Sequence, residues 1–327
     1  MNGDPRVLVV APYLGEFGWE LMNWQGRVRR LLMDQTHPRV VLCASPDRRP
    51  LYANAAADGR FLFCPVHVDA PGIASEDHRI DARGNRHDPE RLRLLTCDAA
   101  RRACEHYGID LAHAEFLTPD YRGTLWPTDR ADQWFSELRQ SSPLETDILL
   151  VPRTRKSATE RNQPASWWEE LAARLIREGL SVEVYMAPLS NAIRQLSRAR
   201  LAIGASTGGL HLASLCRCPH FVWGSGADDR WTALKFSNRQ RYETIWNPFG
   251  TPCRYDECGW QPTVHYILKK SLGALAEIGL PRGRATPAWS WNPKWRIKRR
   301  IARLLDDRRG ILPWPWTVRQ FVREHVV

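Results

Sequence analysis

The stretch 201–219, LAIGASTGGLHLASLCRCP, has the residue types of an anion-binding turn. Its apolar start predicts a short strand over 201–203, its small residues a loop over 204–209, and the residues that follow a helix over 210–215. The first N–H groups of a helix lack intrahelical acceptors and lie at the positive end of the helix dipole, so a diphosphate can bind there. The residues that would hold it are Ser206, Thr207, Gly208, Gly209 and His211. An ordinary strand-to-helix turn, with His211 packed in the core, is the alternative interpretation.

A cluster of cations follows another predicted strand, 148–151, in the stretch PRTRKSATERN. The cations are Arg153, Arg155, Lys156 and Arg161. A guanidinium group matches phosphate oxygens with paired hydrogen bonds and a lysine adds a compact charge, so this loop could neutralise a leaving diphosphate. A charged loop that faces water is the alternative. Because this loop and the turn at 204–209 would share one edge of a sheet, we expect them to form one site.

Two carboxylates follow the first predicted strand, 7–11, in the stretch GEFGWEL. Glu16 would lie in a tight turn and Glu20 in the helix that follows. Either could accept a proton from an acceptor hydroxyl, although acidic residues are also favoured in a first helical turn by the helix dipole alone. The sequence leaves both choices open. Further contacts with an acceptor are expected from Gly15, Gly18 and Trp19.

Alternating strand and helix patterns must position these residues. In the first half they predict strands over 7–11, 40–44 and 61–66, helices over 17–33 and 91–107, and a surface loop over 68–89. In the second half they predict strands over 148–151, 182–186, 201–204 and 220–223, and helices over 166–178, 189–199, 210–215 and 262–278. The expected fold class is α/β, with two Rossmann-like domains, 1–143 and 144–281, that face each other across a cleft.

Some functions are disfavoured by motifs that the sequence lacks. GxGxxG is missing after the first strand and GxxxxGK[ST] is missing everywhere, which argues against a nicotinamide dehydrogenase and a P-loop ATPase. The eight cysteines show no paired CxxC spacing, which predicts reduced thiols and no metal site.

The net charge of +11 belongs mainly to a basic, Trp-rich tail over 282–327, which holds twelve Arg and Lys against three acidic residues. Within it, 289–309 has the pattern of a basic amphipathic helix beside tryptophans, which suits an anionic membrane surface. Packing of its apolar stripe on the body of the protein is the alternative, and nucleic acid is not the expected partner. No apolar window is long enough for a membrane span. These observations predict a cytoplasmic protein, peripheral at the inner face of the membrane if the tail binds lipid.

The stretch TGGLHLASLCRCP resembles the TG-x-x-HLA signature of GT-B glycosyltransferases related to the ADP-heptose:lipopolysaccharide heptosyltransferases. GEFGWEL and the segment from Arg153 to Asn162 resemble a less characterised group of bacterial GT-B-like glycosyltransferases. Together the similar segments span about residues 5–280 and leave the tail unmatched. That family usually has Asp before the TG pair, where this chain has Ser206.

The resemblance implies an inverting, metal-independent transfer of a sugar from a nucleotide-diphosphate donor to a glycan or lipid-linked acceptor of the cell envelope. The nucleotide sugar would be a substrate, and no cofactor is expected. The domain over 1–143 would bind the acceptor and the domain over 144–281 the donor. The donor diphosphate would be held by Thr207, Gly208 and Gly209 with Arg153 and Lys156, while Glu16 or Glu20 would activate the acceptor.

Three other functions stay open at this point. One is a non-catalytic nucleotide or sugar binding protein of the same fold. Another is a sugar-nucleotide-modifying enzyme such as an epimerase. The third is a nucleic-acid binder that works through the basic tail, with binding that depends steeply on salt.

Overall fold

The computed structural model describes residues 7–34, 37–66, 73–74, 77–81, 89–112, 114–119, 127–155, 158–226 and 236–281. These residues belong to one compact unit. Three sequence predictions fall outside them: Lys156, much of the loop over 68–89, and the whole tail from 282 with its membrane-binding segment over 289–309.

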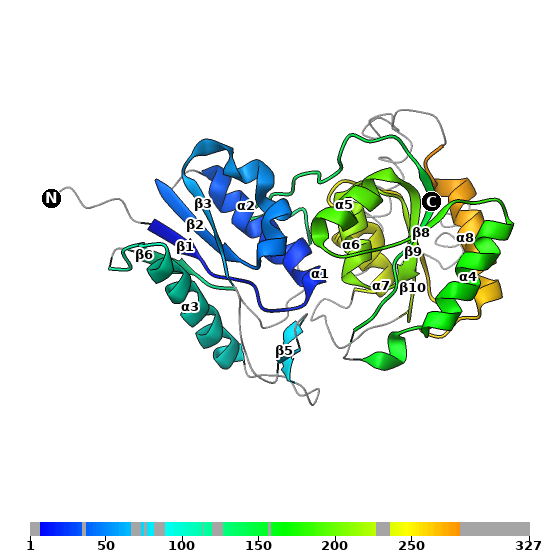
Figure 1. The fold of residues 1–327 in the computed structure, drawn as a ribbon, viewed down its shortest axis with the longest axis horizontal. Coiled ribbons are helices and arrows are strands. Elements are labelled where there is room, and N and C mark those ends of the chain that lie inside the picture. The colour runs from blue at the N-terminus through cyan, green and yellow to red at the C-terminus, as the bar shows by residue number, and fades with distance from the viewer. Residues whose placement is uncertain are drawn as a thin grey trace, which may run out of the picture. The chain divides into compact units, whose positions relative to one another are not determined.

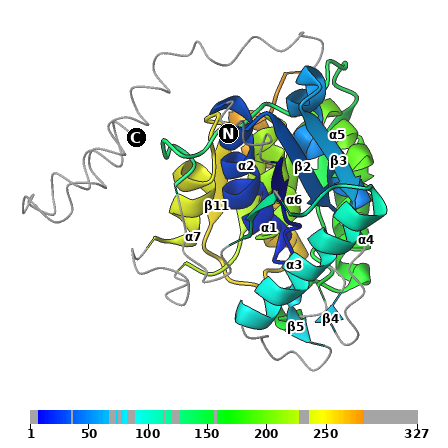
Figure 2. The same ribbon diagram turned by 90° about the vertical axis from the view of Figure 1, so that its left-hand side faces the viewer.

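The first sheet has four parallel strands in the order β3-β2-β1-β6. They are β1 (Val7–Val10), β2 (Arg39–Ala44), β3 (Phe61–Pro65) and β6 (Ala114–Leu117). The continuous apolar run of β2 is typical of a parallel strand whose two faces are both covered. Figures 1 and 2 show α3 (Pro89–His106) on one face, and α1 (Phe17–Trp19), η1 (Glu20–Trp24) and α2 (Gln25–Asp34) on the other.

The second sheet has five parallel strands in the order β11-β10-β9-β7-β8. They are β7 (Thr146–Leu150), β8 (Val182–Val184), β9 (Ala199–Ala205), β10 (His220–Trp223) and β11 (Cys253–Asp256). One face packs against α4 (Ala165–Arg177) and α8 (Val264–Ile278), and the other against α5 (Leu189–Arg198) and α6 (Gly208–Leu215). Along the chain, α4 follows β7, α5 follows β8 and α6 follows β9, which is the alternation of doubly wound α/β folds.

One apolar core continues from the first sheet to the second. It contains Val10 of β1, Trp19 of α1, Ile193 of α5 and Leu212 of α6. The two α/β halves are thus joined by packed helices as well as by the chain between them. The expected fold class of two Rossmann-like parallel units is confirmed. The division of the chain at residue 143 and at residue 281 stays a prediction.

The predicted elements differ from the observed ones mainly near the candidate site. The single helix expected over 17–33 is divided by the π-helical turn η1, and such turns are frequent at functional sites. The helix expected from Leu210 begins at Gly208. The loop expected over 68–89 contains a short antiparallel pair, β4 (Ile73–Ala74) and β5 (Asp77–Asp81).

Several short elements escape the sequence patterns because they lack a clear period. They are β6, β11, the 3-10 segment η2 (Pro46–Asp58), η3 (Thr159–Arg161), α7 (Asn238–Gln240) and the π-helical η5 (Arg241–Ile245). Of these, η2 carries residues that matter for the site described below.

The end of β9 requires a residue without a side chain. A Cβ on Gly204 would lie 2.5 Å from the backbone oxygen of Val151, which cannot move without disturbing β7. We expect Gly204→Ala to lower the free energy of unfolding by about 1–3 kcal/mol in urea denaturation. Gly273→Ala in α8 is the matched control, since a Cβ there meets nothing within 4 Å, and it should stabilise the protein by about 0.5–1 kcal/mol. Equal changes in the free energy of unfolding for the two variants would contradict the close approach of Gly204 to the Val151 backbone.

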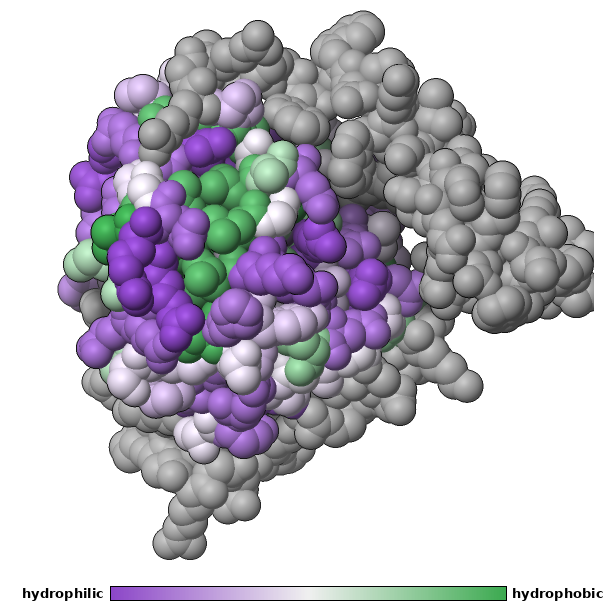
Figure 3. All heavy atoms as spheres, turned by 90° about the vertical axis from the view of Figure 1, so that its right-hand side faces the viewer, coloured by the Kyte–Doolittle hydropathy of each residue, from purple (hydrophilic) through white to green (hydrophobic). Residues whose placement is uncertain are grey.

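The face on which α4 and α8 lie is shown in Figure 3, where apolar residues form an area surrounded by hydrophilic ones. Large exposed apolar side chains of the second half include Ile176, Val184, Met186 and Tyr266. Within the described ranges, no helix is long and apolar enough to cross a bilayer.

Candidate functional site

The loops that carry the predicted anion-binding residues start from neighbouring strands. β7 and β9 pair in parallel, and the N–H of Val151 donates to the Ile203 carbonyl at 2.8 Å where both strands end. The basic loop follows Val151, and the small-residue turn begins at Ser206. The fold therefore starts both loops at the same edge of the second sheet, where α/β proteins bind their ligands.

The N-terminus of α6 presents backbone donors at this edge. Thr207 is its N-cap in an extended conformation, and its side chain makes no capping hydrogen bond. Within the described residues, no acceptor is recorded for the N–H groups of Gly208 and Gly209. These two donors and the helix dipole are what an anion would meet.

The two glycines also serve packing, which the sequence did not indicate. A Cβ on Gly208 would lie 2.9 Å from Cδ1 of Phe17 and 3.3 Å from the backbone nitrogen of Gly18. A Cβ on Gly209 would lie 2.7 Å from Cγ1 of Val151. Helix α1 of the first half thus rests directly on the N-terminus of α6, which brings the residues just before α1 to the same place.

Glu16 is the carboxylate that this contact brings to the basic loop. It is the N-cap of α1, and its Oε1 lies 2.7 Å from Nη1 of Arg155, with the two side chains 28% and 20% exposed. The ion pair joins segments that are far apart in the sequence and belong to different sheets. A carboxylate, a guanidinium group and a helix N-terminus therefore meet in one partly exposed site.

Glu20 lies in a different environment. It is buried in η1, and its Oε2 accepts a hydrogen bond from Nε of Arg48 at 2.7 Å. Burial raises the pKa of Glu20, and the nearby Arg48 guanidinium partly opposes this rise. The two carboxylates that the sequence could not tell apart thus differ in exposure and in partner.

The other arginines of the basic loop hold its shape. Arg153 is buried, and its Nη1 donates to the Ala158 carbonyl at 2.9 Å and to Oδ1 of Asn162. Burial lowers the pKa of Arg153 to about 10, helped by Arg155 and Arg161, so it is still a cation at neutral pH. The Arg161 guanidinium lies 4.6 Å from the ring centroid of Trp260.

Ser206 and His211 have partners inside the protein. The Ser206 hydroxyl accepts a hydrogen bond from Nη2 of Arg241 at 2.8 Å and lies 3.0 Å from the Tyr242 hydroxyl. The buried His211 ring stacks on Tyr242 with centroids 4.1 Å apart. Burial lowers the pKa of His211 well below its ordinary value, with Arg241 and His220 adding to the effect. A neutral, stacked ring fits a packing role for His211.

Of the residues expected to contact an acceptor, Gly18 and Trp19 contact the second half, and Gly15 lies against Tyr13 of its own half. A Cβ on Gly18 would lie 3.1 Å from Cδ2 of His211, and one on Gly15 would lie 2.6 Å from the Tyr13 ring. Trp19 is buried and packs edge-on against Trp246 at 5.0 Å. In the structure these residues make close contacts within the chain.

Two residues near the site were missed by the sequence analysis. The Arg48 guanidinium lies 4.6 Å from the ring centroid of Phe17, and the Tyr185 ring is 3.4 Å from a Cβ position on Gly209. Both follow the ends of strands, β2 and β8. The rule that located the basic loop, namely that site residues follow the carboxyl ends of parallel strands, could have found them.

A metal site is a further feature that the sequence predicts to be absent. Among the described residues, no group of three or more His, Cys, Asp or Glu side chains is arranged to hold a metal ion. All eight cysteines are free thiols, including the pair Cys253 and Cys258.

The acid stability of the second half should depend on its buried histidines. Burial lowers the pKa of His220 to about 4. The contact of its Nδ1 with the Cys218 carbonyl, at 3.0 Å, raises the pKa but does not offset the effect of burial. The unfolded chain binds this proton near pH 6.5, so stability present above pH 6.5 is lost as the pH falls towards 4. We expect a loss on the order of 3 kcal/mol from this group, seen as a steeper pH dependence in urea unfolding than that of His220→Gln. Parallel pH profiles for the two proteins would contradict this.

No protein-family model and no curated protein sequence matches this chain. Similar solved structures include the ADP-heptose lipopolysaccharide heptosyltransferase II of E. coli, at 12% identity over 83% of this chain and 99% of that one, with a TM-score of 0.47. A glycosyl transferase family 9 protein from Veillonella parvula is 12% identical over 85% of this chain and 99% of that one, with a TM-score of 0.44. An E. coli heptosyltransferase with ADP is 13% identical over 84% of this chain and 100% of that one, with a TM-score of 0.40.

Two of these structures are heptosyltransferases, the group that the sequence resemblance indicates, and one is a glycosyl transferase family 9 protein. With TM-scores below 0.5 and low identity, the likeness does not by itself establish a shared fold or activity. The fold assignment rests on the two parallel sheets of this chain, and the activity has to be argued from its own residues.

Proposed function

We propose that this chain is an inverting, metal-independent glycosyltransferase that moves a sugar from a nucleoside-diphosphate sugar to a glycan or lipid-linked acceptor of the cell envelope. The observation that supports this most is the ion pair between Glu16 and Arg155 beside the N-terminus of α6. It brings together a group that can take a proton and two kinds of group that stabilise an anion.

The donor would bind through its diphosphate. Phosphate oxygens would accept hydrogen bonds from the N–H groups of Gly208 and Gly209 and from the Arg155 guanidinium. Negative charge grows on the diphosphate as the bond to the sugar breaks, so these fixed donors stabilise the transition state more than the bound donor.

The acceptor hydroxyl would be activated by Glu16. As the hydroxyl oxygen forms its bond to the anomeric carbon from the face opposite the diphosphate, its proton passes to the Glu16 carboxylate, and the nucleoside diphosphate leaves with the electron pair of the broken bond. Glu20 is buried and paired with Arg48, so we assign it a positioning role.

Without a donor, the carboxylate and the guanidinium neutralise each other. A diphosphate that binds Arg155 would displace Glu16 and free it for the acceptor. Donor binding would therefore precede activation of the acceptor, which limits unwanted attack by water before the site is complete.

The first test is a thermal-shift titration of the full chain with ADP, UDP, GDP, CDP and dTDP. We expect one nucleoside diphosphate to raise the melting temperature in a concentration-dependent way, because a ligand that binds only the folded state stabilises it. The matching sugar nucleotide is then incubated with acceptors in EDTA, and transfer with inversion at the anomeric carbon is expected. If none of the nucleotides binds, the proposal fails; binding without any transfer or donor hydrolysis would instead indicate a non-catalytic binding protein.

A further inference from the structure

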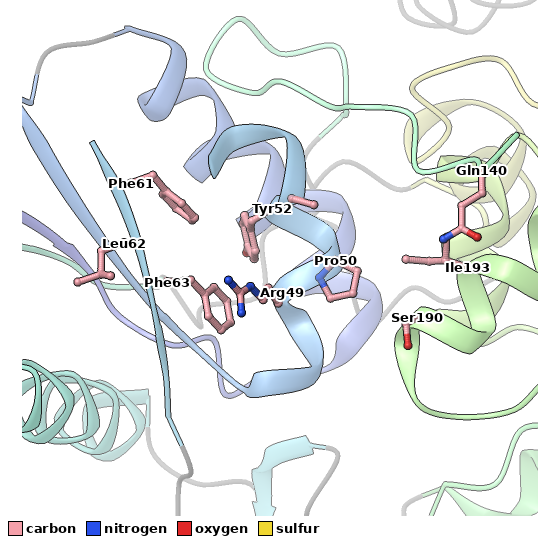
Figure 4. A pocket seen from close by; sticks show the side chains of 10 residues that line it. Arg49, Pro50, Tyr52, Phe61, Leu62, Phe63, Gln140, Ser190 and Ile193 are labelled. Carbon is pink, nitrogen blue, oxygen red and sulfur yellow. The ribbon is translucent and has the colours of Figure 1, made fainter. Parts of the chain in front are cut away.

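An open pocket of about 620 Å³ is lined by residues of both halves. One side is formed by η2 and the edge strand β3, and the other by α5 and the segment that precedes β7. Figure 4 shows Arg49 beside the Phe63 ring, with Ser190 and Ile193 reaching from α5 on the far side of Pro50. Its volume lies within the roughly 300–1,000 Å³ range of small-molecule sites.

The walls of the pocket are largely aromatic and aliphatic. Phe61 and Phe63 alternate along β3 and so project from the same face of the strand, and both are only partly buried. Tyr52 of η2 and Ile193 of α5 are buried and complete this lining. Partly exposed rings beside an open hollow favour an apolar ligand, since its burial removes their surface from water.

Arg49 is a cation in the wall of the pocket. The Arg49 guanidinium lies 5.8 Å from the ring centroid of Phe63, and no described residue forms an ion pair with it. Its neighbour Arg48, by contrast, is paired with Glu20 and with Asp47. An unpaired guanidinium at an aromatic wall favours a ligand that carries an anionic group on an apolar body.

The segment η2 links the pocket to the proposed transfer site, because it carries Arg49 of the pocket and Arg48 beside Phe17. Arg48, the residue before Arg49, lies over the Phe17 ring, and Phe17 directly follows Glu16. Tyr52 of the pocket is close enough to Glu20 and Arg48 for their charges to act on its hydroxyl. Arg48 and Phe17 are therefore the residues that separate the pocket from the carboxylate that would activate the acceptor.

We propose that this pocket binds the lipid-phosphate part of the acceptor, with the apolar chain against Phe61 and Phe63 and the phosphate on Arg49. This inference rests on the proposed function and narrows the acceptor to a lipid-linked one. The carrier would sit in the pocket, and the sugar hydroxyl that it presents would reach Glu16.

Geranyl phosphate, a short soluble isoprenyl phosphate, tests the inference by isothermal titration without any turnover. We expect it to bind to the full chain, while geraniol, which lacks the anion, and inorganic phosphate, which lacks the chain, bind at least about 10-fold more weakly. Arg49→Gln and Phe63→Ala are each expected to weaken the binding of geranyl phosphate by roughly 10-fold or more. Arg102→Gln on α3, an exposed arginine paired with Asp98, is the matched control and should change nothing.

Binding of the nucleoside diphosphate is measured on the same variants to separate this inference from the proposed function. Arg49→Gln should leave nucleotide affinity unchanged, which also shows that the variant is folded. If nucleotide binds but geranyl phosphate does not, or if Arg49→Gln and Arg102→Gln bind geranyl phosphate equally, the pocket assignment is overturned and the transferase proposal is unaffected. Equal affinity for geraniol and geranyl phosphate would likewise overturn the role of Arg49.

Discussion

Replacing Glu16 by glutamine is expected to lower turnover about 10²–10⁴-fold, the usual contribution of a general base. The amide cannot take the acceptor's proton, although it has nearly the same size and can still contact Arg155. Affinity for the nucleoside diphosphate should be kept or increase, because the carboxylate that competes with the diphosphate for Arg155 is gone. Initial rates of sugar transfer and isothermal titration with the nucleotide measure the two effects separately.

The comparison with Glu20→Gln decides between the two carboxylates. Glu20 is buried against Arg48, so its replacement should act mainly on the stability of η1 and on the placement of Arg48. Glu170→Gln, on the exposed side of α4, controls for the loss of a surface charge. If Glu16→Gln had normal turnover and Glu20→Gln were folded but inactive, Glu20 would be the general base.

Replacing Arg155 by glutamine is expected to weaken binding of the nucleoside diphosphate roughly 10- to 100-fold, the range for loss of a charge-assisted hydrogen bond. The turnover of bound donor should also fall, because the guanidinium would stabilise charge that develops on the leaving diphosphate. Arg174→Gln, an exposed arginine paired with Glu170 on α4, is the matched control and should leave nucleotide binding unchanged.

The double variant Glu16→Gln/Arg155→Gln tests whether the two residues compete in the way that the ion pair indicates. If Glu16 occupies the guanidinium in the absence of donor, Glu16→Gln improves nucleotide affinity more when Arg155 is present than when it is absent. Strictly additive effects on affinity would mean that the diphosphate does not displace Glu16 from Arg155.

The architecture could be predicted in large part because its signals are local. Apolar runs such as those of β2, β7 and β9 mark buried parallel strands whatever their neighbours, and the helices between them show their period directly. The short elements η2, α7 and η5 have no such period, so they could be seen only in the folded chain.

From the sequence, the candidate site could be predicted only as sets of candidates: the basic loop and the glycine turn in the second half, and two carboxylates in the first. The rule that ligand-binding loops follow the carboxyl ends of strands brought the basic loop and the turn at Ser206 together, and it also applies to Arg48. It could not distinguish Arg155, which meets Glu16, from Arg153, which is buried and supports its own loop. These differences depend on what packs against each side chain.

The sequence by itself determined the two α/β halves, the positions of the glycine turn and the cationic loop, and the presence of two candidate carboxylates. Only the tertiary structure decided that Phe17 rests on Gly208, that Glu16 pairs with Arg155 and that Glu20 is buried beside Arg48. The physical reason is that periodicity and turn chemistry are set by residues a few positions apart. Ion pairs and burial depend on surfaces contributed by segments far apart along the chain.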